Sequence, residues 1–528
     1  MDGLGHAADV ALRAEASMPA PPPNLDHIIL RSSAWVALSW GGRNVLSMLG
    51  AIVLARLLDP RAFGLVAIAA TITTVLDYIQ ESGVGAALVQ RKHDVKQAAA
   101  SAFVWSSCAG LLLGASCFAA APLLARGFGA PGATNVIRAM SLFLVIRGVS
   151  IGPGSLLDRE MNFRTRTFGE LAAGFAQLGI SVGLALAGFG VWSLVIGQLA
   201  ATAVQTAILW MLAPWRPHPR DASISVLREM LRYGRFVSLG NILGLVNRTL
   251  DNLVVGRILG APALGVYSMS YRLGDFPTGV VGYVVGRVMF PAYSRVQDDL
   301  AAFRNAFVQN LERVALLALP TSVALFVYAE PIVSVLLGEK WLAAVTPLRI
   351  LAVYTIVRSF VSPTGAVFQA AGKPHLVPLW ALPQSVLFPI TLLVLVPRFG
   401  VSGAAIAVLV SFSASAVPAF RTCIRMLDLR MSELVPRLLP LVVASVLMGL
   451  AMELTLRLDI PAAASLGAGI TAGTAVYGAA TALLARPLLS SAWAGLRPGP
   501  SRRAKRRWAD VDGVETPRRA GSGRREHL

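Results

Sequence analysis

The sequence has few charged residues for its length. Acidic and basic side chains make up 14% of the 528 residues, and 55% of the residues are hydrophobic. A soluble protein usually carries about 25% charged residues. A soluble fold of this length cannot bury so much apolar surface. The composition therefore predicts an all-α polytopic membrane protein.

Cysteine and histidine are also scarce. The three cysteines, Cys108, Cys117 and Cys423, exclude a disulfide framework and lack the spacing of metal ligands. The six histidines form no ligand cluster in the sequence. The outer loops contain no paired carboxylates of the kind that a membrane glycosyltransferase uses. We therefore expect no cofactor, no metal and no catalytic residues, and so no enzyme activity.

Apolar runs fill the chain from residue 34 to residue 487 and predict about fourteen transmembrane helices. These 454 residues leave about 32 for each span with its connection, and a span needs about 20 residues. No room remains for a soluble domain. Twelve spans are the alternative, if the short region 168–213 is over-divided. The runs lie near residues 34–58, 62–80, 99–125, 134–157, 168–189, 190–213, 236–260, 263–291, 311–337, 345–371, 376–398, 400–427, 434–458 and 461–486.

Basic residues give the chain a net charge of +19 and concentrate in alternate connections. The connections around Arg91, Arg164, Arg228, Arg304 and Arg425 are rich in arginine or lysine, whereas the intervening ones carry few. Short cytoplasmic loops of membrane proteins show this excess of positive charge. The pattern predicts an even number of spans with both termini in the cytoplasm.

Two similarities within the chain indicate an internal duplication. Residues 56–65 resemble residues 257–266, which lie 201 residues later. A pair of arginines nine residues apart, Arg138 and Arg147, recurs 211 residues later. An offset near 200 residues corresponds to six spans, so both copies cross the membrane in the same sense. We therefore expect two parallel six-helix bundles with a central cavity between them.

The sequence thus predicts six consecutive regions. The basic tail lacks interleaved aromatic residues, so we expect it to contact anionic lipid and not nucleic acid. The regions are a disordered cytoplasmic N-terminus (1–33), a first six-helix bundle (34–213), a cytoplasmic linker (214–235), a second six-helix bundle (236–427), two additional transmembrane helices (428–487) and a basic cytoplasmic tail (488–528).

Five arginines fall within the predicted spans: Arg43, Arg147, Arg248, Arg272 and Arg358. Each charge at mid-depth costs about 2.5–3.5 kcal/mol on insertion scales, so these side chains must face water, an opposite charge or a ligand. Arginines that line a cavity bind phosphate or pyrophosphate well, because the guanidinium makes bidentate charge-assisted bonds. We therefore predict that these five form an anion-binding site.

Ion pairing within one helix is the alternative for two of these arginines. Arg248 and Asp251 lie three residues apart, as do Arg272 and Asp275, so each pair shares one helical face. Arg147 and Arg358 have no carboxylate one turn away along their own span. The ligand-binding interpretation is therefore stronger for these two.

Acidic residues within the spans are candidates for coupling transport to protons or cations. Asp77 and Glu81 lie four residues apart and so share one helical face. A polar helix end with a salt bridge to Arg43 would explain them equally well. Asp251 and Asp275 are further coupling candidates.

Several motifs resemble those of the Wzx-type polysaccharide biosynthesis flippases, within the multidrug/oligosaccharidyl-lipid/polysaccharide exporter superfamily. The resemblance covers residues 31–166 best and extends more weakly to about residue 430. It is carried by AlaArgLeuLeuAspProArgAlaPheGlyLeu (55–65), GluSerGlyValGlyAlaAlaLeuValGln (81–90), LeuLeuAspArgGluMetAsnPheArg (156–164) and LeuLeuGlyGluLysTrp (336–341).

This resemblance implies twelve to fourteen helices in two bundles in the bacterial inner membrane. It also implies alternating access that moves an undecaprenyl-pyrophosphate-linked oligosaccharide between leaflets for polysaccharide, lipopolysaccharide or exopolysaccharide synthesis. A polysaccharide polymerase and other assembly proteins are the implied partners. Three alternatives stay open: a drug or cation exporter, a peptidoglycan-precursor flippase, and an assembly scaffold that transports nothing. A cationic substrate would be repelled by the arginines.

Overall fold

The computed structural model describes residues 25–485 except 92, 161, 162, 214, 215, 217 and 459, and its regular structure there is helical throughout. The elements are α2 (Leu25–Leu57), α3 (Pro60–Glu81), α4 (Val84–Gln90), α5 (Val95–Gly127), η1 (Pro131–Ala133), α6 (Thr134–Arg159), α7 (Phe163–Leu186), α8 (Val191–Leu212), η2 (Pro219–Asp221), α9 (Ile224–Ser294), α10 (Leu300–Val327), α11 (Ala329–Ile332), η3 (Val333–Leu337), η4 (Glu339–Ala344), α12 (Val345–Ala370), α13 (Leu376–Met426), α14 (Met431–Leu456) and α15 (Ala462–Leu484).

Two of the long helices are bent at glycines. Gly260 in α9 and Gly400 in α13 have positive φ angles of 82° and 59°, a conformation that glycine adopts without steric cost. Each bend falls between two apolar runs predicted from the sequence. When each arm is counted separately and α2 is included, the described chain has fourteen segments of membrane-crossing length. Eleven helices of the described chain, with α9 and α13 each counted once, are long and apolar enough to cross a membrane. The region 168–213 forms the two helices α7 and α8, so it is not over-divided.

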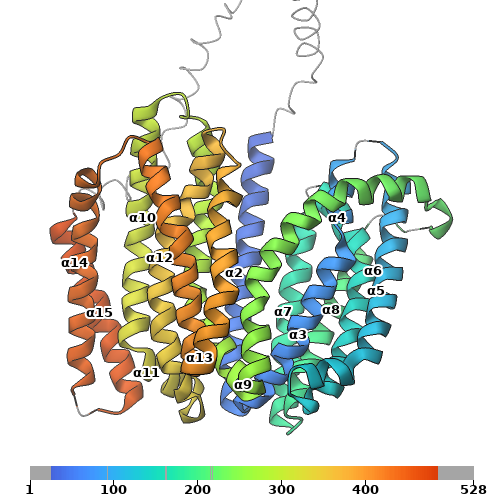
Figure 1. Ribbon diagram of the computed structural model, residues 1–528, viewed down its shortest axis with the longest axis horizontal. Coiled ribbons are helices and arrows are strands. Elements are labelled where there is room, and N and C mark those ends of the chain that lie inside the picture. The colour runs from blue at the N-terminus through green and yellow to red at the C-terminus, as the bar shows by residue number, and fades with distance from the viewer. Residues whose placement is uncertain are drawn as a thin grey trace, which may run out of the picture.

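The helices form two lobes, with α14 and α15 at one edge (Figure 1). We call α2 to α8 the N-lobe and α9 to α13 the C-lobe. Figure 1 shows that the lobes meet at its lower end and diverge at its upper end, where, among the described elements, only the start of α9 crosses to the N-lobe. Helices α14 and α15 pack on each other, and α14 also packs on α10. This arrangement is the duplicated two-bundle fold with two extra helices that the sequence predicts.

The two copies of the duplicated motif contact each other at the lower end. A Cβ atom on Gly64 would lie 1.7 Å from the carbonyl oxygen of Ala261, and one on Gly265 would lie 1.9 Å from that of Pro60. The two glycines are 201 positions apart, as are Pro60 and Ala261, so the contact is reciprocal, as at a two-fold axis. Only glycine allows α3 and the second arm of α9 to approach so closely.

A second set of contacts joins the lobes at the lower end. The Arg56 guanidinium, at the end of α2, donates to the carbonyl oxygens of Leu336 at 3.1 Å and of Val335. The indole of Trp341 is fully buried and donates to the carbonyl oxygen of Ala55 at 2.9 Å. Motif 55–65 and motif 336–341 therefore meet across the lobes.

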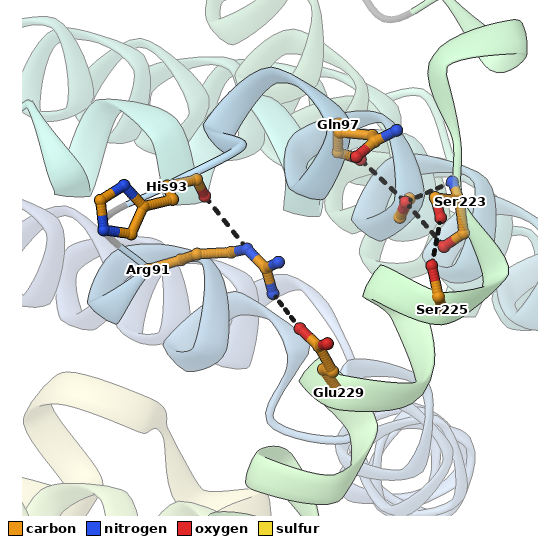
Figure 2. Close-up of polar contacts among 7 residues, drawn as sticks. Arg91, His93, Gln97, Ser223, Ser225 and Glu229 are labelled. Atoms are coloured by element: carbon orange, nitrogen blue, oxygen red, sulfur yellow. Dashed lines mark hydrogen bonds and ion pairs between the residues drawn. The ribbon is translucent and has the colours of Figure 1, made fainter.

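The start of α9 is attached to the upper end of the N-lobe (Figure 2). Arg91 pairs with Glu229 at 3.0 Å, and the Ser101 hydroxyl accepts a hydrogen bond from the Ser223 amide at 2.9 Å. Val226 is buried against α4 and α5. The predicted linker, 214–235, includes the start of α9: residues 224–235 are helical, and their apolar face packs on the N-lobe.

Two other boundaries differ from those predicted. Helix α2 begins at Leu25, so residues 25–33 are helical where a disordered segment was expected. Hydropathy detects only the apolar part of a membrane helix, whereas the helix can continue into the polar interface. Helix α10 covers Leu300–Val327 and not 311–337, because Asp299 caps its start through the amides of Ala301 and Ala302. The predicted regions before residue 25 and after residue 485 lie outside the described residues.

Candidate functional site

A polar cavity of about 420 Å³ lies between α2, α7 and α8 of the N-lobe. Arg272, from the second arm of α9, also lines it and so brings a C-lobe residue to the cavity. Polar side chains within membrane helices usually face protein or a water-filled space, because exposure to lipid is costly. The polar lining consists of Arg43, Asn44, Ser47, Glu170, Gln177, Gln198, Thr202, Gln205 and Arg272.

Two of the five predicted arginines line this cavity, and neither forms an ion pair with a described carboxylate. The Arg43 guanidinium makes no hydrogen bond to another residue that the structure describes. Arg272 donates to the backbone carbonyl oxygen of Ser47 at 2.9 Å and to its hydroxyl. Glu170 is the one acidic residue in the described lining, and it pairs with Arg166 at 3.0 Å. The cavity therefore carries excess positive charge, which suits an anion.

Arg147 and Arg358 lie elsewhere and are paired with aspartates of neighbouring helices. Arg147 on α6 lies 3.7 Å from Asp77 on α3. Arg358 on α12 forms an ion pair with Asp275 on α9 and lies 5.9 Å from the ring centroid of Tyr354. A search for carboxylates one turn away on the same helix could not find these partners, because they lie on neighbouring helices. The proposed salt bridge between Asp77 and Arg43 is wrong, since Asp77 lies beside Arg147.

These two ion pairs occupy equivalent places in the two lobes. Asp275 follows Asp77 by 198 residues, and Arg358 follows Arg147 by 211 residues. In both lobes the carboxylate is on the helix that begins at the lower-end glycine contact, which is α3 for Asp77 and the second arm of α9 for Asp275. The duplication therefore repeats a charged pair, of which the sequence pattern revealed only the arginine half.

The alternative that Arg272 pairs with Asp275 is wrong. Although the two side chains share a face of α9, Asp275 is bound by Arg358, and Arg272 reaches across to α2. Asp251, also in the C-lobe, does not line the cavity. It is buried and accepts hydrogen bonds from the Tyr267 hydroxyl at 2.7 Å and the Asn252 amide at 2.8 Å.

The remaining predicted site residues are less informative. The side chain of Arg248 lies outside the described residues, so its pairing with Asp251 stays a prediction. Glu81 is half-buried at the upper end of α3 and does not line the 420 Å³ cavity. Among the described residues, no group of three or more His, Cys, Asp or Glu side chains is placed to hold a metal ion.

Three glutamines in the cavity were not predicted from the sequence. Gln177 is on α7, and Gln198 and Gln205 lie seven residues apart on one face of α8. The available signal was a repeated carboxamide on one face of a helix without charged residues. A search restricted to ionisable residues does not find it.

Comparison with known proteins identifies relatives in polysaccharide biosynthesis. The family profile described as polysaccharide biosynthesis protein matches residues 53–346. The succinoglycan biosynthesis transport protein ExoT of Rhizobium meliloti (strain 1021) is 30% identical over 363 residues, covering 68% of this chain and 72% of that protein. The lipopolysaccharide biosynthesis protein WzxC of Escherichia coli (strain K12) is 27% identical over 328 residues, covering 61% of this chain and 65% of that protein.

Solved structures share the fold. The lipid II flippase MurJ in an inward closed conformation superposes with a TM-score of 0.73 at 15% identity, covering 86% of this chain and 99% of that one. An inward-facing multidrug resistance MATE family transporter of the MOP superfamily gives a TM-score of 0.53 at 18% identity, covering 75% of this chain and 94% of that one. At these identities the similarity concerns the fold alone.

Proposed function

The chain belongs to the polysaccharide biosynthesis protein family, and we propose that it is a flippase for a lipid-linked oligosaccharide. Its substrate is a glycan on undecaprenyl pyrophosphate, carried from the cytoplasmic to the periplasmic leaflet of the bacterial inner membrane. The names of the relatives in succinoglycan and lipopolysaccharide biosynthesis support this substrate class. The protein moves its substrate without changing it covalently.

One observation carries the proposal: the positively charged cavity in a membrane-spanning bundle. Arg43 and Arg272 line the 420 Å³ space without a described carboxylate partner. A pyrophosphate would replace the missing counter-charge and accept bidentate hydrogen bonds from both guanidinium groups. The two arginines come from different lobes, so the substrate would bind both bodies that move during transport.

The contacts at the lower end of the lobes support alternating access. We assign this end to the periplasm and both termini to the cytoplasm, since the connections at the upper end carry most of the basic residues. The reciprocal contact of Gly64 with Gly265, together with Arg56 on the carbonyl oxygen of Leu336, holds the lobes together there. The two predicted bundles, 34–213 and 236–427, would rock about this contact.

Coupling to an ion gradient would use the acidic residues within the spans. Asp77 and Asp275 are each neutralised by an arginine, and protonation of either carboxylate would weaken its pair. Glu81 and Asp251 complete the set of candidates. Interaction with a polysaccharide polymerase, and of the basic tail 488–528 with anionic lipid, is also part of the proposal.

A peptidoglycan-precursor flippase is the second candidate function, because the lipid II flippase MurJ shows that this fold can serve such a substrate. Both substrates carry pyrophosphate, so the arginines do not distinguish them. The family relatives favour the polysaccharide unit. A drug or cation exporter would bind its substrate poorly beside two uncompensated arginines, and a scaffold would not need the cavity.

Substitution of the cavity arginines tests the proposal. We expect Arg43→Ala with Arg272→Ala to abolish polysaccharide export in cells that lack the native protein, at an unchanged level in the membrane. Each lost charge-assisted hydrogen bond removes about 1.5–3 kcal/mol of binding. Arg398→Ala is the matched control, because Arg398 is exposed, lies beside the bend of α13 at Gly400 and does not line the cavity. Normal export by the double variant would contradict the proposal.

A further inference from the structure

Three glutamine side chains in the cavity have no hydrogen-bond partner among the described residues. Gln177, Gln198 and Gln205 are half-buried and belong to the membrane helices α7 and α8. A carboxamide can donate two hydrogen bonds and accept two. Leaving those groups unpaired inside a membrane bundle is costly, so this surface is built to be wet or to bind a polar ligand.

The three carboxamides share one surface of the cavity. Gln198 and Gln205 are two turns apart on α8, with Thr202 between them on the same face. Gln177 reaches the same space from α7, which packs directly on α8. We call Gln177, Gln198, Thr202 and Gln205 the amide wall. Its length along α8 follows from the rise of about 1.5 Å per residue, which gives about 10 Å between Gln198 and Gln205.

Neutral donors and acceptors of this kind match sugar hydroxyls. A hydroxyl both donates and accepts a hydrogen bond, as a carboxamide does, whereas a phosphate only accepts and is better bound by the arginines. The three glutamines and the two arginines come from different helices, although Asn44 and Ser47 lie on α2 with Arg43. The amide wall belongs to α7 and α8, and the two arginines belong to α2 and α9.

Resting on the proposed function, we propose that the amide wall is a sugar subsite, which binds the hydroxyl groups of the glycan while Arg43 and Arg272 hold the pyrophosphate. The wall is neutral, so its ligand is an uncharged hexose and not a sugar acid. Its span of about 10 Å accommodates the sugars nearest the pyrophosphate. The wall lies wholly in the N-lobe, so this lobe selects the glycan.

A binding measurement with two probes tests the subsite. The purified full-length protein in lipid nanodiscs is titrated with undecaprenyl pyrophosphate and with the same carrier bearing a neutral hexose disaccharide. We expect the wild-type protein to bind the glycosylated carrier at least tenfold more tightly. The variant Gln177→Ala/Gln198→Ala/Gln205→Ala should bind both probes within about twofold of each other, and its affinity for the bare carrier should be unchanged.

The control is Gln384→Ala, because Gln384 is also a half-buried glutamine in a membrane helix and lies outside this cavity. It should keep the wild-type preference. The sugar subsite is overturned if the triple variant keeps the preference, or if the wild-type protein binds the bare carrier as tightly as the glycosylated one. Either result leaves the proposed function intact. Failure of the wild-type protein to bind either probe would overturn both.

Discussion

The glycine contact between the two motif copies gives the sharpest prediction about closure of the lobes. In Gly64→Ala the new Cβ atom would lie 1.7 Å from the carbonyl oxygen of Ala261, whereas ordinary contacts begin near 3.4 Å. The obstacle is backbone, so α3 and α9 must separate by about 1.5 Å or more. Overpacking of this kind costs about 3 kcal/mol, which shifts the closed state about 100-fold toward open.

Distances between two spin labels, measured by double electron–electron resonance, check this separation. Spin labels at Phe189→Cys in the N-lobe and Phe399→Cys in the C-lobe report on the lower end, where both residues are exposed, with the native cysteines replaced by alanine. We expect a longer distance in Gly64→Ala than in the wild-type protein. Gly179→Ala should leave the distance unchanged, because nothing lies within 4 Å of its new Cβ atom.

The same reasoning predicts how far the lobes separate in the double variant. Gly64→Ala and Gly265→Ala each force the same two helices apart, so their combination should add little to either single change. A Gly64→Ala protein with the wild-type distance and normal transport would refute the claim that this contact holds the lobes together.

Two further predictions concern polar contacts within the lobes. Arg358→Gln should lower the free energy of unfolding by about 2 kcal/mol, because it leaves the partly exposed Asp275 unpaired. The double variant Asp275→Asn/Arg358→Gln should recover at least half of that loss. Losses that add up in denaturant titrations would contradict the pairing. Gln80→Leu should lower the free energy of unfolding by about 1 kcal/mol in the same titrations. The buried Gln80 amide donates to the carbonyl oxygens of Leu144 at 3.0 Å and Ser106 at 3.2 Å, which lie on two other helices. A change no larger than that of Gln384→Leu would argue against this role.

The helical fold could be predicted from the sequence because each membrane-spanning helix needs about 20 mostly apolar residues, which stand out in the sequence. The gap between the runs 236–260 and 263–291 marks the bend at Gly260, and the gap at residue 399 marks that at Gly400. Boundaries in polar segments were less accurate. The start of α9 is apolar on one face only, so hydropathy assigned residues 224–235 to a linker.

The candidate site was only partly predictable. Inserting an arginine into a membrane is costly, so the sequence identified Arg43 and Arg272 as residues that need a polar environment. It could not identify the partners of Arg147 and Arg358, because Asp77 and Asp275 lie on other helices. The glutamines of the amide wall carry no charge, so a search for charged groups passed over them.

Transport by the purified protein tests the central claim most directly. The full-length chain is reconstituted into liposomes that contain a fluorescent undecaprenyl-pyrophosphate-linked oligosaccharide, and the fraction of lipid exposed to an external quencher is followed over time. The account predicts rapid exchange between leaflets with the wild-type protein and with Arg398→Ala. It predicts exchange no faster than in protein-free liposomes when Arg43 and Arg272 are both replaced by alanine. Wild-type liposomes that exchange the lipid no faster than empty ones would contradict it.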